Sequence, residues 1–174
     1  MTIINFLEKH MNKIINSDLS KMQVFWLAAL RVLIGWHFLY EGLVKLTNPN
    51  WSAVGYLLDS EGLFKGLFYR MAGSETLLAA VDFINVWALI LIGLVLILGV
   101  LEKPALLGGV ALLALYYLSH PPFVGLKYGL PTEGSYLIVN KVLIELVAML
   151  VLFYFPTSQR IGLCRLITNL KKSK

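Results

Sequence analysis

Long apolar runs separated by short polar segments dominate the chain after its first 22 residues. Four runs resemble membrane spans, at residues 23–46, 83–101, 105–120 and 135–155. A helix needs about 20 mostly apolar residues to cross about 30 Å of hydrocarbon. The third run is short, but Pro104 before it suits the first turn of a helix. The pattern predicts an all-α protein, specifically an integral membrane four-helix bundle.

The segments between the runs predict how the helices connect. Only Glu102, Lys103 and Pro104 separate the second run from the third, so these two helices should be antiparallel neighbours. Residues 47–82 form a long connection rich in aromatic side chains, which suits an interfacial layer. The connection at 121–134 holds three prolines and three glycines, so no regular structure is expected there.

The two ends of the chain predict amphipathic segments outside the membrane domain of residues 23–156. In residues 1–22, charged residues alternate with apolar residues at helical spacing, namely Ile3, Leu7, Met11, Ile14 and Ile15. Such a pattern is typical of a helix lying on the membrane surface. This segment is too polar to be a cleaved signal peptide. Residues 157–174 are predicted to form a basic cytoplasmic tail.

Composition and charge support the membrane class and predict an orientation. Of the 174 residues, 58% are hydrophobic and only 14% are charged, whereas soluble domains have about 25% charged residues. With four spans, both chain termini and the connection at 102–104 lie on the same side of the membrane. That side carries most of the basic residues: Lys9, Lys13, Lys21, Lys103, Arg160, Arg165, Lys171, Lys172 and Lys174. The positive-inside rule therefore predicts that both termini are cytoplasmic. The net charge of +5 is explained by membrane orientation and contact with anionic lipid, and it does not indicate nucleic-acid binding.

Ionisable residues interrupt the first run, although a charge at mid-membrane costs about 2.5–3.5 kcal/mol. On an ideal helix a stripe about 120° wide holds four of them: Arg31, His37, Glu41 and Lys45. Gly35 and Gly42 lie beside this stripe and would let another helix approach closely.

The polar residues of all four runs fall in their outer halves, which predicts one ligand pocket there. The candidate ligand-binding residues are Arg31, His37, Glu41, Lys45, Asp82, Asn85, His120, Asn140, Lys141 and Glu145. Of these, His37 and Glu41 are the candidates for catalytic proton transfer.

Several candidates have a purely structural alternative. Helical rise places Arg31 about 12 Å and Glu145 about 15 Å above the inner face, so we predict an ion pair that could simply fix helix order. His120 could anchor the loop that follows it. Glu41 and Lys45 could snorkel to the interface.

Other chemistries find no support in the sequence. The single cysteine, Cys164, cannot form an internal disulfide. No zinc-hydrolase, P-loop or dinucleotide motif is present, and no metal site is predicted. A haem held by two histidines is disfavoured because His37 lies about 13 Å deeper than His120. Four short spans without an inverted repeat argue against a secondary transporter.

Three segments carry a resemblance to a known family: RVLIGWHFLYEGLVKL, ILIGLVLILGVLEKPALLGGVALLALYYLSHPPF and EGSYLIVNKVLIELVAMLVL. The first holds an R-x3-G-x2-F-x3-G-x2-K pattern, and the third holds Asn140 and Lys141 at the head of its span. Over residues 23–156 the chain resembles the DoxX family, in the form found in Bacteroidetes-type bacteria. These small four-span proteins are named for their likeness to the membrane subunit of thiosulfate:quinone oxidoreductase. Asp82 would take the place of a glutamate that many members carry within the second span.

Pocket and resemblance together predict a membrane subunit of an oxidoreductase-type complex that binds quinone or a similar amphipathic ligand, and the resemblance implies a multi-pass protein of a bacterial inner membrane. The chain itself carries no redox centre, so electrons would come from a periplasmic or intramembrane protein partner. One alternative is a non-enzymatic membrane anchor or assembly factor for an envelope protein, working through residues 47–82. Another is binding of a lipid headgroup. Membrane lipid and a homo-oligomer are further expected partners, since glycine-lined helix faces serve either internal packing or dimerisation.

Overall fold

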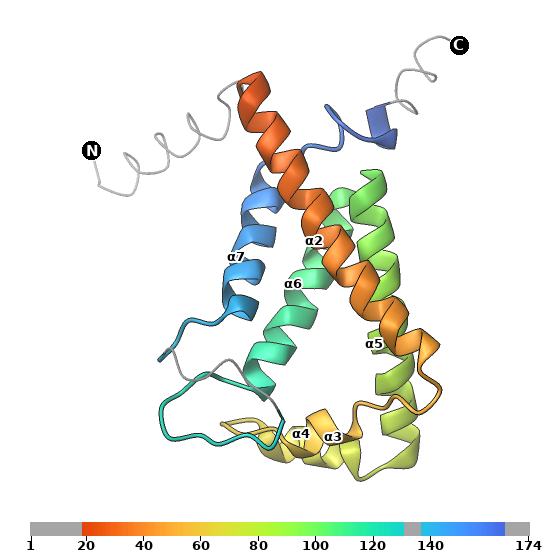
Figure 1. Ribbon diagram of the computed structural model, residues 1–174, viewed down its shortest axis with the longest axis vertical. Helices are drawn as coiled ribbons and strands as arrows, with labels where there is room; N and C mark the ends of the chain where they lie inside the picture. Colours follow the sequence, from red (N-terminus) through yellow and green to blue (C-terminus); the bar gives the residue numbers. More distant parts are fainter. Residues whose placement is uncertain (1–18, 131–136, 166–174) are drawn as a thin grey trace, which may run out of the picture.

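Helices form the framework of the computed structural model, which describes residues 19–130 and 137–165 (Figure 1). They are α2 (Lys21–Thr47), α3 (Val54–Leu58), α4 (Lys65–Ala72), α5 (Glu75–Leu98), α6 (Glu102–Ser119) and α7 (Lys141–Tyr154). The described residues contain no strand, and the all-α prediction is confirmed. The surface helix predicted over residues 1–22 lies outside the described residues, apart from residues 19–22.

Two helices are long and apolar enough to cross a membrane: α2 with 27 residues and α5 with 24. By length and composition, these two helices indicate that the protein associates with a membrane. The other two long helices are shorter than expected for independent spans. α6 has 18 residues and begins with the charged Glu102 and Lys103. α7 has 14 residues, which is about 21 Å of helix.

Local capping explains where two helices depart from their predicted bounds. α5 begins at Glu75 instead of Phe83, because the Ser74 side chain accepts a hydrogen bond from the backbone N–H of Leu77. α7 begins only at Lys141, because the Asn140 side chain accepts one from the Leu143 N–H at 2.9 Å. Asn140, a candidate ligand-binding residue, is therefore a helix cap.

Glycines bring α2 and α5 into close contact. A Cβ atom added to Gly35 would lie 3.0 Å from the Gly93 carbonyl oxygen, and one added to Gly42 would lie 2.7 Å from Ile90 Cγ1. The close approach predicted from Gly35 and Gly42 therefore occurs within the chain. α6 packs against both α5 and α7, whereas α2 meets α7 at only a few positions.

The described chain starts and finishes at the same end of the long helices (Figure 1). There, Arg160 Nη1 donates a hydrogen bond to the Leu19 carbonyl at 3.1 Å. We call this the terminal end. The connection after α2, with α3 and α4, lies at the opposite end together with residues 120–130. We call that the loop end.

The long connection between α2 and α5 is a packed layer at the loop end. Ala53, Leu57 and Phe68 form a small buried cluster, against which residues near the start of α5 also pack. Asp82 of α5 accepts a hydrogen bond from the Ala53 N–H at 2.8 Å. Asp82 therefore fastens this layer to α5 and does not line the cavity described below.

Candidate functional site

A cavity of about 400 Å³ lies among the four long helices at their loop end. Each of these helices contributes polar side chains to it. The predicted candidates that line the cavity are His37, Glu41, Lys45, Asn85, Lys141 and Glu145. The structure thus gathers at one place ionisable and amide groups that are more than 100 residues apart in sequence.

The cavity has an apolar inner wall and a cover at the loop end. Phe38, Leu89 and Leu113 form the inner wall, and each is at most 4% exposed. Residues 51–56 line the loop-end side through Trp51, Ser52, Ala53 and Tyr56. A ligand here would meet polar groups at one end and hydrocarbon at the other, which suits an amphipathic molecule.

A hydrogen bond between His37 and Glu145 joins α2 to α7 at the edge of the cavity. His37 Nδ1 lies 2.8 Å from Glu145 Oε1. The His37 side chain is 54% exposed, whereas the Glu145 side chain is only 15% exposed. The pair therefore connects the interior of the cavity with the outer surface of the helices.

Lys45 is held over the loop-end part of the cavity. Its Nζ lies 3.3 Å from Glu41 Oε2, one helical turn away, and 5.6 Å from the centre of the Trp51 ring. The Lys45 side chain is 17% exposed. Lys45 therefore turns inward toward Trp51. The snorkelling alternative would have placed its ammonium group in water, so it does not describe Lys45.

Asn85 and Tyr116 form a half-buried polar pair in the cavity wall. Asn85 Nδ2 donates a hydrogen bond to Tyr116 Oη at 2.6 Å, which leaves the Tyr116 hydroxyl proton able to donate. Asn85 Oδ1 is buried and has no hydrogen-bond partner among the residues that the structure describes. An unsatisfied buried acceptor costs about 1–3 kcal/mol, so a ligand that donates a hydrogen bond here would remove that cost.

Tyr116, Trp51 and Tyr56 were not among the predicted site residues, yet all three line the cavity. Tyr116 lies one helical turn before the candidate His120 and therefore on the same face of the third run. This spacing could have identified Tyr116 as a further site residue. Nothing in the sequence indicated that residues 51–56 fold back over the helices.

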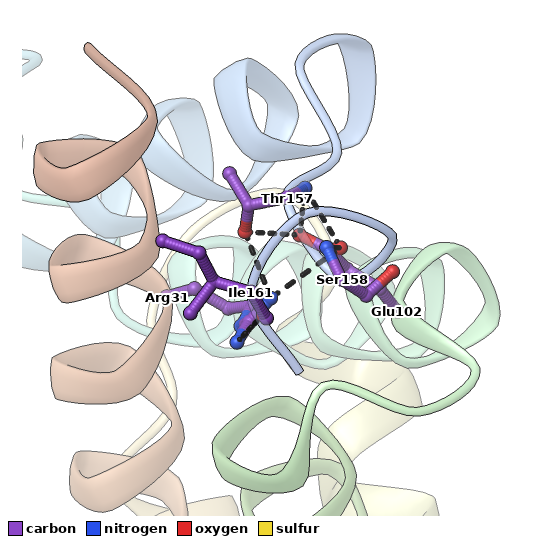
Figure 2. Close-up of polar contacts among 5 residues, drawn as sticks. All are labelled: Arg31, Glu102, Thr157, Ser158 and Ile161. Atoms are coloured by element: carbon purple, nitrogen blue, oxygen red, sulfur yellow. Dashed lines mark hydrogen bonds and ion pairs between the residues drawn. The ribbon is translucent and has the colours of Figure 1, made fainter. Parts of the chain in front are cut away.

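Arg31 lies in a buried polar cluster with side chains and backbone of the chain after α7 (Figure 2), and it does not line the cavity. Its Nη1 donates to Thr157 Oγ1 and its Nη2 donates to the Ile161 carbonyl, each at 2.8 Å. Arg31 Nη1 also lies 3.7 Å from Glu102 Oε2. Arg31 and Glu102 are 2% and 3% exposed. The predicted Arg31–Glu145 pair is therefore wrong: Arg31 pairs with Glu102, and Glu145 pairs with His37.

The chain after α7 completes this cluster. The Glu102 carboxylate accepts hydrogen bonds from the backbone N–H groups of Thr157 and Ser158, at 2.9 and 2.6 Å. Thr157 is fully buried. The packed fold thus extends past the boundary expected at residue 156, and Glu102 is the first residue of α6 where a connector was expected.

His120 lies in the loop-end layer, where it anchors the connection that follows α6. Its ring stacks on Tyr56 with 4.0 Å between ring centres, and Tyr128 lies on the ring at 4.8 Å. His120 Nε2 lies 3.5 Å from Asp59 Oδ2. Burial lowers the pKa of His120 more than the nearby carboxylate raises it. The structural alternative for His120 matches this geometry.

Asp59 ties residues 129 and 130 to the layer, and its removal should free that connection. Its carboxylate accepts hydrogen bonds from the backbone N–H groups of Gly129 and Leu130, at 2.6 and 3.0 Å. Hydrogen bonds to charged groups contribute about 1.5–3 kcal/mol. We therefore expect Asp59→Ala to raise the rate of tryptic cleavage after Lys127 about tenfold. Glu61→Ala, which removes a neighbouring carboxylate, is the control and should leave that rate unchanged.

The same contact should weaken only at acidic pH. Burial raises the pKa of Asp59, but the bonds from Leu130 and Gly129, with His120 nearby, outweigh burial and hold it below its usual value of 3.8. A lowered carboxyl pKa stabilises the fold above the unfolded-state pKa, and that stabilisation disappears as the pH falls through the folded-state pKa. The Asp59 carboxyl carbon resonance should therefore show its large protonation shift only below about pH 4, beneath any smaller change caused by titration of His120. A full protonation shift of this carbon near pH 6 would contradict the assignment.

Comparisons of the chain with protein-family models, with curated proteins and with solved structures find no match. The chemistry of the cavity is therefore inferred from its own residues. Those residues combine proton-carrying groups, hydrogen-bond donors, one buried unpaired acceptor and an apolar wall.

Proposed function

We propose that the chain is the membrane subunit of an oxidoreductase-type complex and binds quinone, or a similar amphipathic ligand, in the cavity. The observation that carries this proposal is the unpaired, buried Asn85 Oδ1 in a cavity that is polar on one side and apolar on the other. The resemblance to the DoxX family points to the same class of function.

The cavity residues suit both redox forms of such a ligand. The carbonyl oxygens of a quinone would accept hydrogen bonds from Tyr116, Lys45 or Lys141. A quinol hydroxyl would donate to Asn85 Oδ1. Reduction of a quinone to a quinol takes two electrons and two protons. A reduced partner protein would supply the electrons, and His37, Glu145 and Glu41 would carry the protons.

The proposal includes a membrane setting. α2 and α5 would span the bilayer, with α6 and α7 completing a four-helix bundle around the cavity. The described residues divide their basic side chains about equally, with Lys21, Lys103, Arg160 and Arg165 in the chain segments of the terminal end and Lys45, Lys65, Arg70 and Lys127 at the loop end. The proposed orientation, with cytoplasmic termini and a loop end facing the periplasm of a bacterial inner membrane, therefore rests on the further lysines of the sequence termini: Lys9, Lys13, Lys171, Lys172 and Lys174.

One observation favours a second candidate function, that of an anchor for another envelope protein. At the loop end, large apolar side chains before and within α4 are exposed: Leu63 at 94%, Leu67 at 53% and Phe64 at 45%. Exposed apolar groups of this kind mark protein or membrane contacts. An anchor would need these residues and would need no ligand in the cavity.

A titration with a soluble short-chain quinol, kept reduced, tests the proposed binding site. We expect Asn85→Leu to raise the dissociation constant of the quinol about tenfold, the equivalent of about 1.4 kcal/mol, because the quinol hydroxyl loses its buried hydrogen bond to Asn85 Oδ1. The readout is quenching of Trp51 fluorescence, isolated as the difference between otherwise identical proteins with and without Trp51→Phe.

Asn50→Leu is the matched control, since it makes the same chemical change at an exposed position. It should leave the dissociation constant unchanged. Equal dissociation constants for the wild type, Asn85→Leu and Asn50→Leu would show that Asn85 Oδ1 does not bind the quinol and would contradict the proposed site.

A further inference from the structure

The sides of the cavity are not equally well closed. Residues 51–56 cover it at the loop end, and Phe38, Leu89 and Leu113 close it on the inner side. Between α2 and α5 the helices touch so closely that a Cβ on Gly93 would lie 2.6 Å from the Gly35 carbonyl oxygen. The groove between α6 and α7 is filled by Met149, which is fully buried and lies against Gly109.

α5 packs against α6, and the hydrogen bond of 2.6 Å from Asn85 to Tyr116 joins them beside the cavity. The remaining side is the boundary between α2 and α7, which we call the α2/α7 seam. These two helices meet at only a few positions. The hydrogen bond between His37 and Glu145 crosses the seam beside the cavity. Since a hydrogen bond to a charged group contributes about 1.5–3 kcal/mol, this contact is far easier to open than the backbone contacts between α2 and α5.

The α2 side of the seam has an apolar outer surface apart from His37 and Glu41, and the α7 side carries the exposed Lys141 one helical turn before Glu145. Leu33, Tyr40 and Val44 lie three to seven residues from His37, which places them on the same face of α2. They are 66%, 56% and 48% exposed. His37 itself lines the cavity, yet its side chain is 54% exposed. The seam thus leads directly from the cavity to a surface that suits hydrocarbon.

We infer that the ligand reaches the cavity sideways from the membrane, through the α2/α7 seam, and keeps an apolar tail between these helices. This inference rests on the proposed function and narrows it. The ligand is a headgroup with a long apolar tail, dissolved in the bilayer, and a water-soluble substrate is excluded. The His37–Glu145 contact opens to admit the headgroup and closes over the tail.

Photolabelling of the wild-type protein in lipid vesicles tests the seam. One probe is a quinone whose long alkyl tail carries a diazirine, and the other carries the diazirine on the quinone ring. We expect the ring probe to label cavity residues such as Trp51 and Tyr116. We expect the tail probe to label Leu33 or Val44 at least tenfold more than Leu91, an apolar residue of α5 that is 55% exposed.

The outcomes distinguish failure of the proposed entry route from failure of the proposed function. If the ring probe labels the cavity but the tail probe labels residues 51–56 or Leu91, the ligand enters elsewhere and the inference is wrong, while the proposed function stands. If excess unlabelled quinone suppresses neither probe, the proposed function fails as well. Suppression of the tail probe by added phospholipid, and not by quinone, would retain the seam and assign the ligand as a lipid.

Discussion

Replacing Arg31 with alanine is expected to destabilise the folded protein by about 3–5 kcal/mol. The reason is that removal of one member of a buried ion pair leaves the other charge uncompensated. Glu102, at 3% exposure, would lose its cationic partner, and Thr157 Oγ1 and the Ile161 carbonyl would lose hydrogen-bond donors. The loss should appear in detergent-denaturation curves followed by far-ultraviolet circular dichroism.

An exposed ion pair of the same chain supplies the control for Arg31→Ala. Lys65 Nζ lies 3.3 Å from Glu61 Oε2, with side chains that are 53% and 34% exposed. Exposed pairs contribute about 0–1 kcal/mol, so Lys65→Ala should have little effect. In the double variant Arg31→Met with Glu102→Gln, part of the lost stability should return. Equal effects of Arg31→Ala and Lys65→Ala would show that the cluster in Figure 2 does not stabilise the fold.

Gly93→Ala is expected to cost about 1–3 kcal/mol or more, although alanine is the better helix former by about 1 kcal/mol. A Cβ at this position would lie 2.5 Å from the Leu39 backbone nitrogen and 2.8 Å from Leu39 Cα. These are backbone atoms of α2, so no side chain can turn aside to make room. The two helices would have to separate, which also opens the inner side of the cavity.

The opposite sign is expected at Gly108 in α6. A Cβ there would lie 3.5 Å from Ile92 Cδ1, an ordinary contact, so Gly108→Ala should gain up to about 1 kcal/mol from helix propensity. The pair of variants is compared by thermal unfolding in the same detergent. If Gly93→Ala is as stable as Gly108→Ala, α2 and α5 are not packed as described.

Hydrophobic patterning predicted the bounds of α2 and α6 and failed for α5 and α7, where capping or polar residues set the bounds. α2 and α6 begin and end within a few residues of their predicted limits, although ionisable residues interrupt the apolar run of α2. The start of α5 was missed because Glu75, Thr76 and Asp82 interrupt the apolar run. α3 and α4 were missed because short helices carry too few periods to be recognised.

The sequence predicted at which end of the helices the polar side chains gather, but it did not predict which side chains pair with one another. His37, Asn85, Lys141 and Glu145 do line one cavity. Their partners depend on relative depth, which was estimated as if all helices were parallel and of full length. α2 is inclined to α7 (Figure 1), and α7 is shorter than assumed, so Glu145 meets His37. Arg31 instead meets a segment after α7 whose return to the helices no local pattern signals.

Mass spectrometry of the protein extracted in mild detergent, recording every bound molecule, tests the central claim most directly. A ligand-binding subunit should carry a quinone or another long-tailed amphiphile in near-equal amount, and Asn85→Leu should lose most of it while Asn50→Leu keeps it. A stoichiometric protein partner that Asn85→Leu also retains, without any such ligand in the wild type, would contradict the claim and favour an anchor for an envelope protein.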